Sequence, residues 1–158
     1  MPTSNQNLVL LDTNILLRLA SVNDPLKSVS AATLRALRLQ GMTLCVCPQN
    51  MQEYRQVATR PEASNGYGWT SEAVAGDLSE LEKEFTLIPE TPAIYPEWRR
   101  ITEVTKATGR ANFDARLVAT ASVSNISAVL SFESAAFARY AACVPGLVII
   151  DPTKASGL

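Results

Sequence analysis

Short apolar runs alternate with longer segments of helical periodicity along the chain. The apolar runs have the length of single strands and lie at 8–11, 42–47, 86–89, 126–132 and 146–151. Helices are expected between them, at 12–19, 25–40, 49–59, 71–85, 92–107, 112–124 and 133–141. Because a helix separates consecutive strands, the strands should pair in parallel. We therefore predict an α/β protein, a three-layer α/β/α sandwich around a mostly parallel sheet of four to five strands.

Composition limits the possible chemistry. The chain has 158 residues and no evident linker or repeat, so we expect one domain over 1–158. Its net charge of −1 offers no general basic surface, so a nucleic-acid role must rest on local residues. The absence of histidine excludes Ser-His-Asp and Cys-His sites and His-ligated zinc. Hydrolysis would have to use carboxylates, hydroxyls, lysines or hard metal ions.

The cysteines and the N-terminal residues suggest an intracellular setting. Cys45 and Cys47 lie two apart in an apolar run, and with Cys143 they make an odd, sparse set. We interpret them as reduced cysteines of a core rather than as metal ligands. The N-terminal residues lack a basic region followed by a long apolar stretch, and no membrane-spanning run is present. We expect a soluble cytoplasmic protein with no membrane partner.

Acidic residues follow several of the predicted strands. Asp12 directly follows the first strand, and Glu133 follows the strand that ends near Phe132. Glu53 lies in the second turn of the helix after the second strand, and Asp114 lies in the first turn of its own helix. Ligands of open parallel sheets bind at the carboxyl ends of the strands. The sequence therefore predicts that Asp12, Glu53 and Glu133 share one rim, which Asp114 can join.

Such a cluster suits a divalent metal. Mg²⁺ and Mn²⁺ prefer carboxylate oxygens, and a bound ion can activate water and stabilise charge on a phosphodiester. Thr13, Asn14 and Ser131 could position a water or a carboxylate beside these acids.

Each acid also has a purely structural explanation. Asp12 could cap the first helix, and Glu133 stands where another helix begins. Glu53 could be an ordinary surface acid, and Asp114 could favour its helix dipole. The shared rim is stronger evidence for a site than any single residue.

The motifs around these acids resemble those of the PIN-domain ribonucleases, in particular VapC-type toxins of bacterial toxin–antitoxin pairs. LLDTNILLRL is similar to the opening motif and places Asp12 as a metal ligand. MQEYRQVATRPEASNGYG and GRANFDARLVATA resemble the second and third motifs and place Glu53 and Asp114. AVLSFESAAFARY resembles the last motif, with Glu133 where Asp or Asn is usual. The resemblance covers nearly the whole chain.

Two further positions depart from the family pattern. Phe113 stands where one subgroup commonly has His, and we expect this change to preserve activity. Ala136 replaces a second Asp of the last motif, so the fourth metal ligand depends on Glu133.

The resemblance implies a Mg²⁺- or Mn²⁺-dependent endoribonuclease that is blocked by a cognate antitoxin and forms a homodimer. The RNA contacts would come from the arginines that flank the motifs, which are Arg55, Arg60, Arg110 and Arg116. An alternative is a non-catalytic interaction module of the same fold. A phosphatase is less favoured, because Asp12-Thr13-Asn14 lacks the second aspartate of a phosphoaspartyl mechanism.

Overall fold

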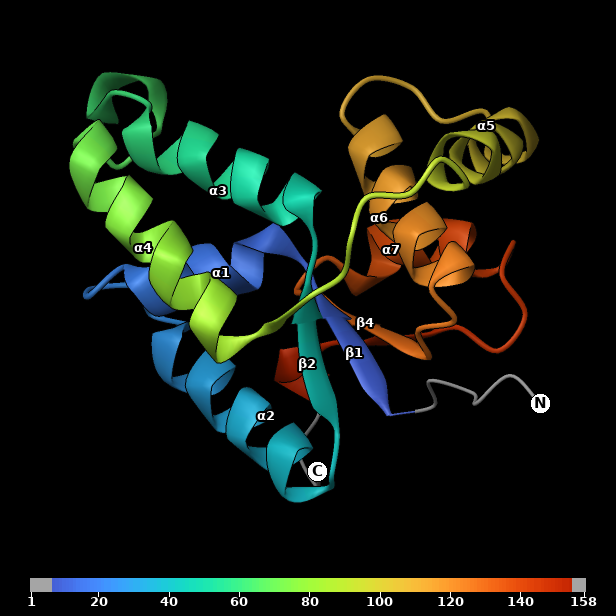
Figure 1. Ribbon diagram of the computed structural model, residues 1–158, viewed down its shortest axis with the longest axis horizontal. Helices are drawn as coiled ribbons and strands as arrows, with labels where there is room; N and C mark the ends of the chain where they lie inside the picture. Colours follow the sequence, from blue (N-terminus) through green and yellow to red (C-terminus); the bar gives the residue numbers. More distant parts are fainter. Residues whose placement is uncertain (1–6, 155–158) are drawn as a thin grey trace.

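A parallel sheet forms the centre of the protein (Figure 1). The structure is a computed structural model, and it describes residues 7–154. Its strands are β1 (Leu8–Leu11), β2 (Thr43–Val46), β3 (Thr86–Leu87), β4 (Ala128–Leu130) and β5 (Val148–Ile150). They are hydrogen-bonded in the order β3-β2-β1-β4-β5, and every pair is parallel. The predicted parallel sheet is confirmed.

Helices cover both faces of this sheet. On one side lie α1 (Thr13–Ala20), α2 (Lys27–Leu39), α3 (Pro48–Thr59) and α4 (Ser71–Glu84) (Figure 1). On the other lie α5 (Ile94–Thr105), α6 (Ala111–Val123) and α7 (Ser134–Ala141). Two short 3-10 turns complete the order, η1 (Glu62–Ser64) and η2 (Pro152–Lys154). The predicted α/β/α sandwich is confirmed, and no helix among residues 7–154 is long and apolar enough to cross a bilayer.

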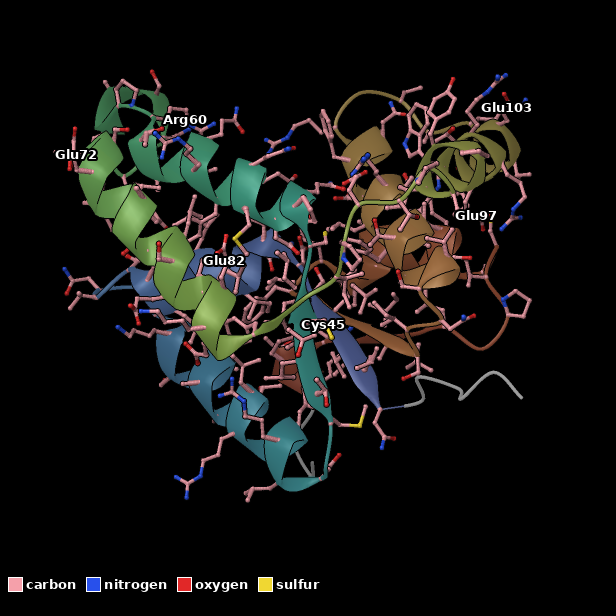
Figure 2. All side chains as sticks on the ribbon, viewed as in Figure 1. Cys45, Arg60, Glu72, Glu82, Glu97 and Glu103 are labelled. Carbon is pink, nitrogen blue, oxygen red and sulfur yellow. The ribbon has the colours of Figure 1, made fainter. Side chains whose placement is uncertain are left out.

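Alternating side chains of the strands build a core on each face. Val9 and Leu11 of β1 pack against α1–α4, whereas Leu10 packs against α5–α7. Successive side chains of a strand point to opposite faces, so an unbroken apolar run is what a doubly covered strand requires. Cys45 and Cys47 are free and buried in the core, as predicted, and both pack on the side of α5–α7. Figure 2 labels Cys45 on β2.

The chain changes direction across the sheet beside β1. It runs outward from β1 through β2 to β3, returns through α5 and α6, and places β4 on the other side of β1. The carboxyl ends of β1 and β4 therefore flank the topological switch point, where open α/β sheets bind ligands.

Several predicted boundaries were wrong by one or two residues, mostly because the strands are shorter than their apolar runs. Helix α6 begins at Ala111, one residue before its predicted start, and the Asn112 side-chain amide donates to the Gly109 carbonyl. Helix α3 begins at Pro48, one residue before its predicted start, and α4 begins at Ser71 as predicted, where the Thr70 hydroxyl caps it by accepting from the Ala73 N–H.

Candidate functional site

Asp12 stands at the switch point, at the carboxyl end of β1. Its backbone N–H donates to the Leu130 carbonyl over 2.9 Å, which extends the pairing of β1 with β4 up to the acid. Its side chain is only 7% exposed. Although Asp12 occupies the N-cap position of α1, its side chain makes no capping hydrogen bond. Helix capping therefore does not account for this carboxylate.

Ser131 holds the Asp12 carboxylate from the end of β4. The fully buried Ser131 hydroxyl donates to Asp12 Oδ2 over 2.7 Å. The same Oγ accepts from the backbone N–H of Glu133 over 2.9 Å. Ser131 thus links the first acid to the backbone that carries the last one.

Asn50 fastens the start of α3 to the end of β1. The fully buried Asn50 amide nitrogen donates to the Leu11 carbonyl at 2.9 Å and to Thr13 Oγ1 at 3.1 Å. Its Oδ1 accepts from the Cys47 N–H over 2.8 Å. Thr13 in turn donates to Glu53 Oε1 over 2.9 Å. This chain of bonds places Glu53 beside the strand end that carries Asp12.

Gln49 joins α3 to α6 on the other side of the site. Its Nε2 donates to the Phe113 carbonyl over 2.8 Å and to Glu53 Oε1 over 3.4 Å. Asp114 is the next residue after Phe113 and lies in the first turn of α6. The bond from Gln49 therefore sets where Asp114 lies relative to Glu53.

Burial and mutual repulsion raise the pKa values of Asp12 and Asp114. Burial raises the pKa of Asp12 to about 7, helped by the charges of Asp114, Glu53 and Glu133 and opposed by the Ser131 hydrogen bond. The pKa of Asp114 is raised to about 6 by burial and then by Glu133 and Glu53.

The pKa of Glu53 is also raised, but more groups oppose the shift. Burial raises its pKa, whereas hydrogen bonds from Thr13 and Gln49 and the charges of two arginines, Arg110 and Arg116, lower it. The four predicted acids therefore share one electrostatic environment, and their ionised forms need a counter-charge.

The chemistry of these donors fits a hard divalent cation, since all are carboxylate oxygens. Asn14 Oδ1 adds a buried acceptor with no hydrogen-bond partner among residues 7–154. The geometry is less complete: within that range no three acidic or cysteine side chains are arranged so that they could hold a metal ion. Glu133 is exposed, and Ala136 offers no fifth carboxylate.

A groove of about 1040 Å³ opens beside the acids between α3 and α6. Glu53, Asp114 and Glu133 line it, whereas Asp12 is not among its lining residues. The remaining lining residues are Gln49, Gln52, Gln56, Arg60, Arg110, Phe113 and Arg116.

The four predicted arginines are distributed unequally. Arg60, Arg110 and Arg116 line the groove, and Arg60 lies near the end of α3 (Figure 2). Arg116 forms an ion pair with Glu90. Arg55 lies outside the lining and donates to Ser71 Oγ.

Sequence reasoning missed the amide side chains of α3. Gln49, Gln52 and Gln56 share one face of the helix with Glu53 and Arg60, a spacing of three, four and seven residues that is visible in the sequence. No comparable spacing in the sequence indicates the role of Asn50. Its amide nitrogen donates to Leu11 and Thr13, which lie 39 and 37 residues away.

The all-parallel sheet with carboxylates gathered at its switch point defines a protein with an acidic site on an α/β/α fold. The chain matches the PIN domain over residues 9–142 and belongs to the PIN domain family. This match confirms the family that the motifs predicted.

Solved structures share this fold at low sequence identity. FitAcB from Neisseria gonorrhoeae is 16% identical with a TM-score of 0.66, over 92% of this chain and 99% of that chain. VapBC2 from Rickettsia felis, bound to a DNA fragment from its promoter, is 16% identical with a TM-score of 0.66, over 91% and 98%. FitAB bound to the IR36 DNA fragment is 15% identical with a TM-score of 0.65, over 91% and 94%. No protein of curated function matches the chain.

Proposed function

We propose that this PIN-domain protein is a divalent-metal-dependent endoribonuclease that acts as the toxin of a toxin–antitoxin pair. The observation that carries the proposal is the gathering of Asp12, Glu53, Asp114 and Glu133, from separate elements, at the switch point of a PIN fold. Buried carboxylates with raised pKa values are costly for a fold and are typical of functional sites.

In this proposal Asp12, Glu53 and Asp114 bind Mg²⁺ or Mn²⁺, and Glu133 serves as the fourth ligand. The bound metal would activate a water molecule and stabilise negative charge on the scissile phosphodiester. Ser131 and Thr13 orient two of these carboxylates through the hydrogen bonds described above. Asn14, two residues after Asp12, would supply a further acceptor, since its Oδ1 is buried with no hydrogen-bond partner among residues 7–154. The groove arginines would contact the RNA backbone, as guanidinium groups suit phosphate.

The proposed partners are an RNA substrate, a cognate antitoxin protein and a second copy of the chain, in the cytoplasm. The resemblance to VapC-type toxins supports the antitoxin, and so does the structural similarity to VapBC2, which is bound to a DNA fragment from its promoter. An antitoxin that covers the groove would block both the acids and the arginines.

A second candidate function is RNA or protein binding without catalysis. It is favoured by the exposed Glu133 and by the lack of three converging ligands among residues 7–154. The two proposals differ in whether the carboxylates take up metal and cleave RNA.

Cleavage of RNA by the purified chain tests the proposed function. We expect cleavage with Mg²⁺ or Mn²⁺ that stops with EDTA. Asp12→Asn and Asp114→Asn should lose more than about tenfold in activity, because losing even a group that supports a metal ligand costs about 10- to 100-fold. Glu82→Gln, an exposed acid on α4 (Figure 2), is the matched control and should cleave normally. Cleavage that survives both substitutions and EDTA would exclude the proposal.

A further inference from the structure

Phe113 is a large apolar side chain that lies exposed next to a carboxylate of the site. It is 56% exposed, whereas Ala115 and Leu117 of the same helix are buried in the core. A single exposed apolar residue is common on proteins, so exposure alone assigns no role. Its surroundings are more informative, because Phe113 precedes Asp114 and lines the same groove as Glu53.

The backbone of Phe113 is held in place from both sides. Its carbonyl accepts from Gln49 Nε2 over 2.8 Å, and its N–H donates to the Arg110 carbonyl over 3.0 Å. The ring is therefore presented from the fixed first turn of α6 rather than from a loop. Groups that position a ligand are most effective when rigid elements carry them.

Gln49 leaves a hydrogen-bond acceptor unused in this groove. The residue is 4% exposed, and its Oε1 is buried with no partner among residues 7–154. Its Nε2 is already committed to Phe113 and Glu53, which fixes the orientation of the amide. A buried acceptor without a donor costs free energy. A ligand with an O–H or N–H group, such as a ribose 2′-hydroxyl or a base amino group, would supply that donor.

Positive charge stands on both sides of the ring. Arg110 and Arg116 are three residues before and after Phe113, and both line the groove. Arg60, at the other end of the lining from Gln49, has a buried Nε without a partner in the described part of the chain. Eleven residues of helix separate Gln49 from Arg60, a rise of about 16 Å. That length suits an extended strand better than a single small anion.

From these contacts we propose that Phe113 positions the substrate by stacking on an unpaired base of single-stranded RNA next to the acids, while Gln49 Oε1 accepts a hydrogen bond from the same region of the strand. The inference rests on the proposed ribonuclease function and adds to it a residue that selects unpaired RNA. Aromatic side chains flanked by guanidinium groups bind single strands through their bases, whereas a duplex keeps its bases stacked and out of reach.

Binding measured in EDTA separates stacking from cleavage. The probe is a fluorescently labelled single-stranded RNA, compared with the duplex of the same sequence. We expect Phe113→Ala and Phe113→Leu to weaken binding of the single strand by roughly five- to a hundredfold, the range of one base stack. Phe113→Trp should restore binding, and its emission should be quenched by the single strand but not by the duplex, beyond the change seen in the unsubstituted chain.

Kinetics with Mg²⁺ or Mn²⁺ provide the second readout. Phe113→Leu should raise KM and leave kcat nearly unchanged, because stacking acts on the bound substrate as well as on the transition state. Tyr95→Leu is the matched control: Tyr95 is an aromatic residue of α5 that is 60% exposed and lies outside the groove lining, and its loss should change neither value.

The outcomes distinguish this inference from the proposed function. An unsubstituted chain that neither binds nor cleaves RNA would overturn both. A chain that cleaves RNA, with Phe113→Leu equal to it in binding and KM, would overturn the stacking alone. Equal losses against single strand and duplex would also overturn the stacking.

Discussion

At the scale of single residues, ionised Asp12 costs the fold more free energy than ionised Asp114, because its pKa is raised further. It is almost wholly buried, and burial raises its pKa from 3.8 to about 7 in spite of the hydrogen bond from Ser131. A carboxylate kept in such a place destabilises the fold when ionised and is expected only where the charge has a use. That cost gives a measurable dependence of stability on pH.

The sign of this dependence follows from the direction of the shift. Because the pKa of Asp12 is higher in the folded chain, the folded state binds more protons between about pH 4 and 7. The free energy of unfolding therefore falls as pH rises through this window, and the penalty is complete above pH 7. Asp12→Asn should remove the penalty and stabilise the chain at pH 8 by roughly 2–4 kcal/mol, with the gain vanishing below pH 4.

Urea unfolding in EDTA at several pH values measures this effect. Glu82→Gln, whose acid is exposed on α4, should show no such pH-dependent gain. An Asp12→Asn gain that is the same at pH 4 and pH 8 would mean that burial of the charge is not its source.

The sequence was sufficient to predict which residues lie at a strand end or a helix start. Asp12 and Asp114 are such residues, and so is Ser131 at the end of β4. Gln49 and Asn50 were not predictable, because their roles depend on partners in β1 and α6 that are distant in the sequence. The exposure of Phe113 likewise depends on how α6 packs and not on its neighbours in the sequence.

At the scale of elements, the attachment of α3 to β1 determines where Glu53 lies. Asn50 makes this attachment by donating to the Leu11 carbonyl of β1 and to Thr13 at the start of α1. Its Oδ1 also accepts from the Cys47 N–H at the start of α3. The predicted helix over this region is confirmed, but periodicity alone gives no register between a helix and a strand. Strand lengths were similarly overestimated, because β4 ends where backbone pairing ends and not where apolar residues end.

Asn50→Ala should lower the free energy of unfolding by about 3 kcal/mol. The substitution leaves the Leu11 carbonyl and the Cys47 N–H buried without their side-chain partner, at a cost of about 1–3 kcal/mol each. Gln56→Ala, an exposed position on the same helix, should stay within about 0.5 kcal/mol of the unsubstituted chain. Denaturant midpoints compare the two, and equal midpoints would show that this attachment contributes little.

At the scale of the whole molecule, topology creates the site. The return of the chain to the other side of β1 brings Ser131 and Glu133 next to Asp12, more than a hundred residues earlier in the sequence. The alternation of strands and helices predicted that the acids share the rim at the carboxyl ends of parallel strands. It did not predict the strand order that puts the switch point beside β1. The sequence did not predict how closely the acidic side chains approach one another. Among the described residues, no three acidic or cysteine side chains lie close enough together to hold a metal ion.

The central claim is that these carboxylates form a divalent metal site, and calorimetric titration with Mn²⁺ tests it most directly. We expect saturable binding with release of protons, stronger at pH 8 than at pH 5.5, because Asp12 and Asp114 have pKa values of about 7 and 6 and must ionise to bind. Asp12→Asn and Asp114→Asn should weaken binding at least about tenfold, whereas Glu82→Gln should bind like the unsubstituted chain. The absence of saturable binding, or equal binding by Asp12→Asn, would contradict the account.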